Sequence, residues 1–330
     1  MAVLTDYMER KLLDHIFGQA AFTRPNGLYL GLSASAFADS DNGTTASAKE
    51  PSGNYARVRI DNISEYNTSN HDIRNTSSID FNEASGSWGD VEYWGIFDGT
   101  GSSANMLMHG SFSSATTVAS GDQFRISTGD LEINFPSSIV AGGNSQNTHN
   151  NTTYWSMAYW RKQIAYFFGF DVGANVINEK FQFCTNTDTL FGQDALWLAV
   201  STSAFPTSGL TAAELSGGGY ARQRIVYGTS TSFSAATTSS GTTSTSNNVA
   251  ISFPEATSSW GDISHFAIFR GIGNQSSETL TAQAQRCSSY DSNYATSYYP
   301  LISGALTSTK TVGSGDRLRF GIGDLVITAS

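Results

Sequence analysis

The sequence predicts a mainly β protein made of two tandem, jelly-roll-like β-sandwich domains, each preceded by a short amphipathic helix. Three observations support this prediction. A series of sequence motifs occurs twice in the same order, apolar residues alternate with a period of two inside them, and Gly-Asp turns separate the resulting short strands. The chain has 330 residues, enough for two ordinary domains with a core each.

The repeated motifs define the two copies. The matching segments are 27–37 and 195–205, 53–60 and 218–225, 87–90 and 259–262, 120–122 and 314–316, and 129–131 and 323–325. Most of the extra length of the second copy falls near 272–300, which we expect to be a surface loop because loops accept insertions more readily than strands do. We therefore expect a first domain at 1–135, a polar linker at 136–152 and a second domain at 153–330.

Each copy is expected to begin with an amphipathic helix. In the first copy, Thr5 can cap a helix that ends near Gly18, and apolar residues spaced four apart form one face between them. In the second copy, Ser156 takes the place of the cap and a more aromatic face follows at 159–168. We expect the first helix to pack on its own sheet, with docking on a neighbour as the alternative.

After each helix, the apolar pattern changes to the period of a strand. The alternate leucines of 28–32 share one face, as do alternate apolar residues of 196–200. Segments 91–97 and 263–269 are apolar on both faces. This pattern predicts that both segments are central strands.

Two further strand predictions concern the first copy. In the segment 55–60, Ala56 is expected to point inward and Arg57 outward, which would give the strand a cationic outer face. The pattern of 124–135 predicts a closing hairpin whose turn contains Gly129 and the aspartate that follows it.

Charge and composition exclude several classes of protein. The formal net charge is −10, with 28 acidic against 18 basic residues, whereas a nucleic-acid-binding protein needs a basic surface to displace counterions. No apolar run approaches the ~20 residues of a membrane span, and the first residues do not resemble an export signal. Cys184 and Cys287 do not form a disulfide framework or a zinc motif, and we expect two free or buried thiols.

The sequence contains no motif of catalysis, metal binding or cofactor binding. It has no Gly-x-Ser-x-Gly elbow and no Gly-Lys pair, and 321–323 lacks the third glycine of a dinucleotide loop. His15, His109 and His265 align with other residue types in the other copy, so a histidine site would exist once at most. We therefore expect no cofactor, no metal and no enzymatic activity.

The aspartates and tryptophans shared by the two copies are expected to form turns and core. Each of these aspartates follows a glycine, where the side chain bonds its own backbone and supports a turn; a calcium site and catalysis are the alternatives. The tryptophans are expected to anchor the core, with exposed sugar-stacking platforms as the alternative. These residues are Trp88, Asp90, Asp122 and Asp130 in the first copy, and Trp260, Asp262, Asp316 and Asp324 in the second.

Tyrosine and arginine side chains supply the candidate protein-contact residues, because both residue types are favoured at interfaces. The Gly-x-Tyr-Ala-Arg motif provides four of them, with pairing of the arginines to neighbouring acids as the alternative. The insertion provides four more, in a Tyr-, Ser- and Asn-rich setting typical of adaptable recognition loops. The candidates are Tyr55, Arg57, Tyr220, Arg222, Tyr290, Tyr294, Tyr298 and Tyr299.

These motifs resemble a family of tailed-bacteriophage virion proteins that commonly carry the label "phage tail fibre protein". The resemblance rests on 4–18, 28–33, 53–57, 87–98 and 118–131, and it recurs in the second copy across about 156–329. It implies a non-enzymatic building block. Members are usually one unit long, so the duplication departs from the family's pattern and the family's stoichiometry does not carry over: two units in one chain could mimic a dimer or fit a pseudo-symmetric site.

We therefore expect a virion structural protein on the particle exterior, made in the cytoplasm of the bacterial host. It would be a tail-associated fibre or adaptor, or a capsid decoration (cement) protein, and would bind tail, neck or major capsid proteins through multivalent contacts. Virion appendages are symmetric, so we expect a homo-oligomer, with a trimer as the first guess. The alternative is a carbohydrate-binding adhesion module for host-surface glycans. A depolymerase would need opposed carboxylates across a cleft.

Overall fold

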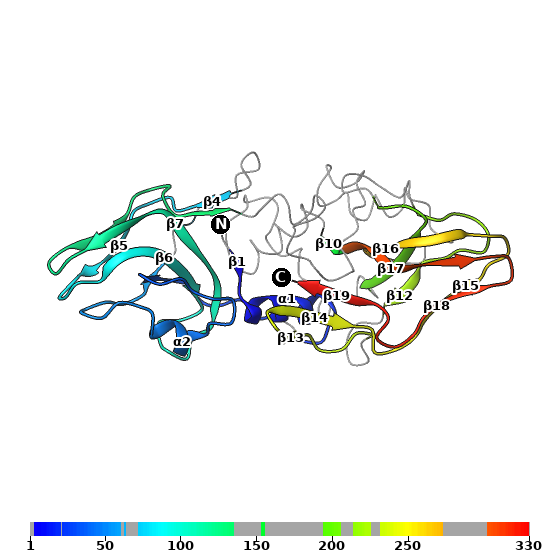
Figure 1. Ribbon diagram of the computed structural model, residues 1–330, viewed down its shortest axis with the longest axis horizontal. Coiled ribbons are helices and arrows are strands. Elements are labelled where there is room, and N and C mark those ends of the chain that lie inside the picture. The colour runs from blue at the N-terminus through cyan, green and yellow to red at the C-terminus, as the bar shows by residue number, and fades with distance from the viewer. Residues whose placement is uncertain are drawn as a thin grey trace.

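The chain is mainly β and forms two units that lie end to end along its longest axis (Figure 1). This confirms the predicted fold class. The computed structural model describes residues 3–20, 22–60, 63, 72–134, 153–155, 194–205, 214–225, 232–272 and 302–329. Each strand pairing within these residues is antiparallel and joins two segments of the same unit.

The first unit has a five-stranded sheet in the order β1-β7-β6-β2-β3 and two small ribbons, β5-β8 and β4-β9. Its elements are β1 (Val3–Leu4), α1 (Asp6–Ile16), β2 (Tyr29–Ser33), α2 (Gly43–Ser47), β3 (Val58–Arg59), β4 (Asp72–Arg74), β5 (Ile79–Glu83), β6 (Gly89–Phe97), β7 (Met106–Val118), β8 (Gln123–Ile126) and β9 (Glu132–Asn134). The predicted central strand is β6, in the middle of the sheet.

The second unit repeats this arrangement, with a five-stranded sheet in the order β10-β17-β16-β11-β12, the ribbon β15-β18 and the sheet β13-β14-β19. Its elements are β10 (Thr153–Trp155), β11 (Asp194–Ser201), β12 (Gln223–Ile225), β13 (Thr237–Ser239), β14 (Thr242–Ser246), β15 (Ile251–Glu255), β16 (Gly261–Ile272), β17 (Ile302–Val312), β18 (Arg317–Phe320) and β19 (Val326–Ala329). The predicted linker and insertion, the second helix and both cysteines lie outside the described residues.

The duplication extends to the register of the strands. Leu30 pairs with Ile96 in the first unit, and the matching Leu198 pairs with Ile268 in the second. The ribbons β5-β8 and β15-β18 both contain a register shift at the same point. The two copies therefore share a strand order as well as motifs. The jelly-roll character of the connections stays a prediction.

The predicted closing hairpin is wrong. The strands on either side of the turn at Gly129 do not pair with each other: β8 pairs with β5, and β9 pairs with β4. The second unit separates β18 and β19 in the same way. The reason is a buried asparagine, Asn75 in the first unit. Its side chain donates a hydrogen bond to the Ser127 carbonyl and accepts hydrogen bonds from the Gly129 and Leu131 amides.

Helix α1 forms where the sequence predicts it. The Thr5 hydroxyl caps it by accepting a hydrogen bond from the Met8 amide at 3.3 Å, and it also donates to the Met106 carbonyl of β7 at 2.6 Å. Gly18 follows the end of the helix with a φ of 75°, a conformation that glycine adopts without strain. Neither described helix has the length and apolar character that a membrane span requires.

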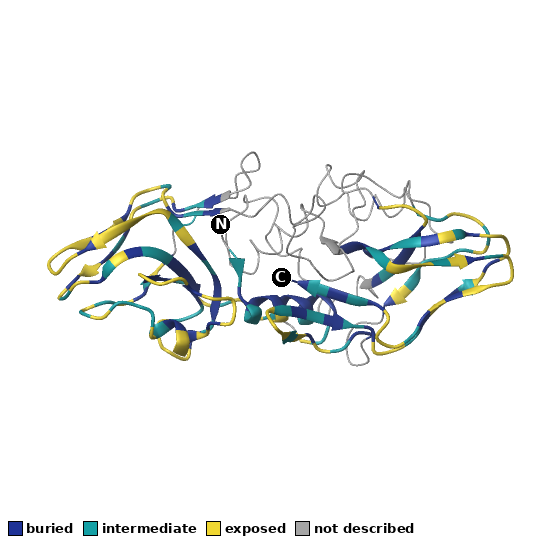
Figure 2. Ribbon diagram, viewed as in Figure 1, coloured by how far each residue is buried: buried dark blue, intermediate teal, exposed yellow. Residues whose placement is uncertain are grey.

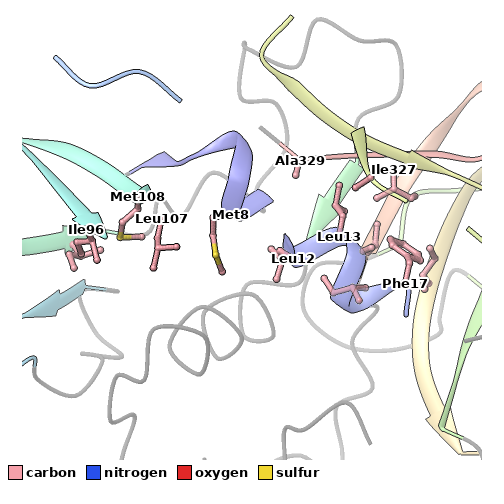
Figure 3. Close-up of a cluster of buried hydrophobic side chains, with 14 of the residues drawn as sticks. Met8, Leu12, Leu13, Phe17, Ile96, Leu107, Met108, Ile327 and Ala329 are labelled. Atoms are coloured by element: carbon pink, nitrogen blue, oxygen red, sulfur yellow. The ribbon is translucent and has the colours of Figure 1, made fainter. Parts of the chain in front are cut away.

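Helix α1 joins the cores of the two units. It packs on β7 of its own unit and on β13, β14 and β19 of the second unit. Figure 3 shows Met8 on the side of Leu107, and Leu13 on the side of Ile327. The Phe17 ring stacks on Phe233 of the second unit with ring centres 4.2 Å apart. The helix therefore packs on its own sheet and also docks on a neighbour, which here is the other half of the chain.

Polar contacts also join the two units here. We call this region the seam: it consists of α1 with the residues up to Gln19 on one side, and of β13, β14, β19, Phe233 and Ala236 on the other. Ala236 donates its backbone amide to the Asp14 carboxylate at 2.7 Å, and Gln19 donates its side-chain amide to the Phe233 carbonyl. Buried residues line α1 and the strands beside it, whereas the exposed residues gather toward the outer ends of both units (Figure 2). The core of the chain is thus continuous across the seam.

Phe17→Ala tests this seam. Removing a fully buried aromatic ring leaves a cavity, so we expect a loss of about 3–5 kcal/mol in the free energy of unfolding, measured with urea. Hydrogen exchange should rise in β14 of the second unit although the substitution lies in the first. Ile322→Ala is the control, because Ile322 is 71% exposed and should change stability by less than about 0.5 kcal/mol. Unchanged exchange in β14 would contradict the role of the helix.

Candidate functional site

A buried Tyr-Glu-Arg cluster lies in the interior of the first unit. It consists of Tyr55, Glu50 and Arg57. Glu50 Oε1 accepts hydrogen bonds from the Tyr55 hydroxyl at 2.9 Å and from Arg57 Nε at 2.8 Å, and Oε2 accepts from Arg57 Nη2 at 2.8 Å. The arginine and glutamate side chains are only 2% and 7% exposed. Both carboxylate oxygens are occupied, so the cluster holds structure and leaves no free general base.

Aromatic rings enclose this cluster. The Arg57 guanidinium lies 3.5 Å from the centre of the Phe97 ring, a cation–π contact. The Tyr55 ring meets Trp88 edge to face at 5.4 Å, and its hydroxyl accepts the Leu32 amide of β2 at 2.7 Å. Burial, together with the Glu50 carboxylate, raises the pKa of Tyr55 far above its ordinary value. The hydroxyl therefore stays protonated and remains a donor to Glu50.

The second unit contains the same cluster, formed by Glu214, Tyr220 and Arg222. Arg222 Nε and Nη2 donate to the two Glu214 oxygens at 2.7 and 2.6 Å, and the Tyr220 hydroxyl donates to Oε1 at 3.0 Å. The guanidinium again covers an aromatic ring, that of Phe269, at 4.0 Å. Trp260 again meets the tyrosine edge to face, at 5.6 Å.

The outward orientation predicted for Arg57 is wrong. Arg57 is 6% exposed, whereas Ala56, expected inside, is exposed. The physical reason is that β3 begins only at Val58, so the alternation of a strand does not extend to these residues. The Arg57 side chain instead pairs with a neighbouring acid, Glu50, which is the alternative given above for this motif.

The structure places the other contact candidates differently. Tyr55 and Tyr220 are half-buried and bonded inside the cluster, and Arg222 has an 8% exposed side chain. The tyrosines of the insertion lie outside the described residues, so their contact role stays a prediction. They are Tyr290, Tyr294, Tyr298 and Tyr299.

The two glutamates of the clusters were missed at the level of sequence. Glu50 lies five residues before its tyrosine, and Glu214 lies six residues before its own. This one-residue difference moves them out of register when the copies are aligned. The available signal was an acid shortly before each Gly-x-Tyr-Ala-Arg motif.

Of the predicted turn and core residues, the tryptophans lie in the core and four of the aspartates lie at turns, whereas Asp90 and Asp262 lie within the strands β6 and β16. Trp88 and Trp260 are 4% and 6% exposed, so exposed sugar-stacking platforms at these residues are excluded. The bonds of the aspartates are short and local, within a turn or across one strand pair. Asp122, Asp316 and Asp324 accept backbone amides at 2.8–2.9 Å, Asp90 and Asp262 accept Thr117 and Thr311 hydroxyls, and the Asp130 amide donates to the Ser127 carbonyl.

A buried asparagine in each unit was also missed. Asn75 accepts the Leu131 amide at 2.9 Å and donates to the Ser127 carbonyl at 2.8 Å. Asn247 accepts the Leu325 amide at 2.8 Å and donates to the Gly321 carbonyl at 2.7 Å. Each asparagine lies four residues before its strand at Ile79 or Ile251, a repeat visible in the sequence but not within the quoted motifs.

The described residues contain no group of three or more His, Cys, Asp and Glu side chains that could hold a metal ion. Burial lowers the pKa of His15 to about 4, so its ring is neutral and its Nδ1 accepts the Phe22 amide at 3.0 Å. His109 contacts Asp39 at 2.8 Å. These interactions connect loops to α1 and β7.

A protein-family model supplies the identification. The model described as Podophage GP4 fiber I protein gp80 matches residues 3–134 and 182–274, about two thirds of the chain. The chain belongs to this family. The first matched segment contains the first unit from β1 to β9, and the second contains β11 to β16 of the second unit. No curated protein matches the chain.

Membership of the gp80 family confirms the resemblance to phage virion proteins. The protein is a member of a phage fibre family and thereby a structural virion component. We therefore interpret the two buried clusters, one in each unit, as structural elements that stabilise the fold of this phage fibre protein.

Glu50→Gln tests the first cluster. The variant leaves the Arg57 charge buried without a carboxylate, so we expect a loss of about 3–5 kcal/mol in the free energy of unfolding, measured with denaturant. Replacing the pair with apolar residues, Glu50→Leu with Arg57→Met, should cost much less. Glu83→Gln is the matched control on the exposed end of β5. A neutral effect of Glu50→Gln would contradict the ion pair.

Asn247→Ala tests the buried asparagine. The truncation leaves several backbone groups of the β18–β19 turn without partners, and each costs about 1–3 kcal/mol when buried. We expect a lower melting temperature and faster exchange at the Leu325 amide. Asn248→Ala is the matched control, since the neighbouring asparagine is exposed and its side chain donates to the Phe233 carbonyl at 3.3 Å and not to the β18–β19 turn. Equal effects of the two substitutions would show that the turn does not depend on Asn247.

Proposed function

We propose that this chain is a non-enzymatic structural protein of a tail-associated fibre on the exterior of a phage particle. The single observation that carries the proposal is the match of about two thirds of the chain to the gp80 fibre family. The family is one of fibre proteins, so we favour a fibre or adaptor at the tail over a capsid decoration protein. We also propose that the protein is synthesised in the cytoplasm of the bacterial host.

The shape of the chain supports this role. Two units placed end to end and joined by one shared helix give a long, coupled building block (Figure 1). In the interior of each unit, a Tyr-Glu-Arg cluster pairs an arginine with a glutamate. The outer part of β7 is a run of exposed hydroxyl residues, and β17 has a shorter exposed run of the same kind. Such a polar, weakly charged surface keeps an exposed appendage soluble.

Assembly is proposed to occur by multivalent contacts with other virion proteins. Two similar units in one chain can engage two equivalent sites, so modest single contacts add up to stable attachment. We propose that copies of the chain form a symmetric homo-oligomer, with a trimer as the working model. The tyrosines of the insertion, Tyr290, Tyr294, Tyr298 and Tyr299, are the proposed contact residues.

Gold-labelled antibody against the chain, viewed on intact particles by electron microscopy, tests the location. We expect label confined to the tail, because the family is one of fibre proteins. The control is the same antibody pre-incubated with the purified chain, which should abolish labelling. Label spread over the shell would make the protein a decoration protein. An unlabelled particle, with an antibody shown to bind the native chain, would exclude an exterior position.

A further inference from the structure

A buried glutamate lies in the seam between the two units. Glu9 belongs to α1, is 4% exposed, and has the fully buried Met8 and Leu12 beside it on the helix. Its side chain forms a hydrogen bond with Thr243 of β14, so the carboxyl group contacts the second unit directly. Any separation of α1 from β14 would transfer this group from the interior to water.

Among the residues that the structure describes, the groups around Glu9 offer it no compensating positive charge. The charged groups that act on it are Asp6 of its own helix and Asp39 of the loop before α2, both acids. Asp39 is in contact with His109 of β7 at 2.8 Å, and Arg10 acts on Asp6. From the second unit, Glu9 meets Thr243, which is bonded to Thr238 of β13 at 2.9 Å. The contacts from that unit are therefore uncharged hydroxyls.

Comparison with Glu50 shows what this environment means. Glu50 is also buried, but Arg57 and Tyr55 donate three hydrogen bonds to it. An ionised carboxylate at Glu9 would have a threonine hydroxyl and two nearby acids instead, and burial of such a charge is costly. Burial accordingly raises the pKa of Glu9 from an ordinary value of 4.5 to about 8.

We propose that the seam between the two units is a pH-sensitive joint, which is closed while Glu9 is protonated and opens more readily once its carboxyl group is ionised. In the closed state Glu9 and Thr243 share a hydrogen bond, and Thr243 is in turn hydrogen-bonded to Thr238. On opening, α1 leaves β14, and Glu9 releases its proton to water. The joint would let the angle between the units respond to the pH around the particle.

The sign of the effect follows from proton linkage. Between pH 4.5 and about 8 the closed state holds a proton that the open state has released, so raising the pH favours opening. The closed state is most favoured below about pH 4.5 and its advantage levels off above about pH 8.

Hydrogen exchange of the full chain, followed at the amides of α1 and β14 from pH 5 to 9.5, tests the joint. After correction for intrinsic exchange, the opening equilibrium constant should rise about tenfold per pH unit between roughly pH 6 and 8. Glu9→Gln keeps the size of the side chain and removes its titration, so its profile should be flat above pH 6. The control Glu83→Gln should keep the slope of the wild type.

Two results would overturn the proposal. The first is a flat profile in the wild-type chain, which needs no variant and therefore remains decisive if Glu9→Gln does not fold. The second is a Glu9→Gln variant that folds and keeps the wild-type slope. Small-angle scattering of the wild type over the same pH range gives an independent readout, with an increase in radius of gyration expected at high pH.

Discussion

The packing of α1 between the two units is the constraint on which the rest of the structure depends. With 11 residues, this helix is shorter than the about 12–15 residues that an isolated helix needs for marginal stability in water. It is stable because its apolar face meets β7 on one side, and β14 and Phe233 on the other. One element therefore joins two repeated β units into a single continuous core.

The buried glutamates have two different environments. Glu50 and Glu214 are paired with arginine and tyrosine, and each cluster fastens a loop to its sheet. Glu9 meets hydroxyls instead, and the low polarity of the seam favours its neutral form. In a fibre protein, the rigid clusters would preserve each unit, while the seam would be the part that responds.

Sequence patterns were reliable where the physics is local. The cap at Thr5, the end of α1 at Gly18 and the central strand β6 follow from spacing and residue type, and the structure has all three. The same reasoning failed at Arg57, because the alternation of a strand was extended to residues that precede β3. It also failed at Gly129, where a turn between two alternating segments was read as a hairpin. There the deciding group is Asn75, more than 50 residues away in the chain.

By itself, the sequence determined the duplication, the β class, the first helix and the turns, because these depend on contacts within a few residues. Only the tertiary structure decided which groups meet over long distances. Glu50 and Arg57 are seven residues apart, and their pairing depends on a loop conformation that the periodicity of apolar residues in the sequence cannot describe. Asp14 and Ala236 are 222 residues apart. That contact forms because the apolar face of α1 and the open side of β14 are each too exposed alone, so burial of both surfaces brings the units together.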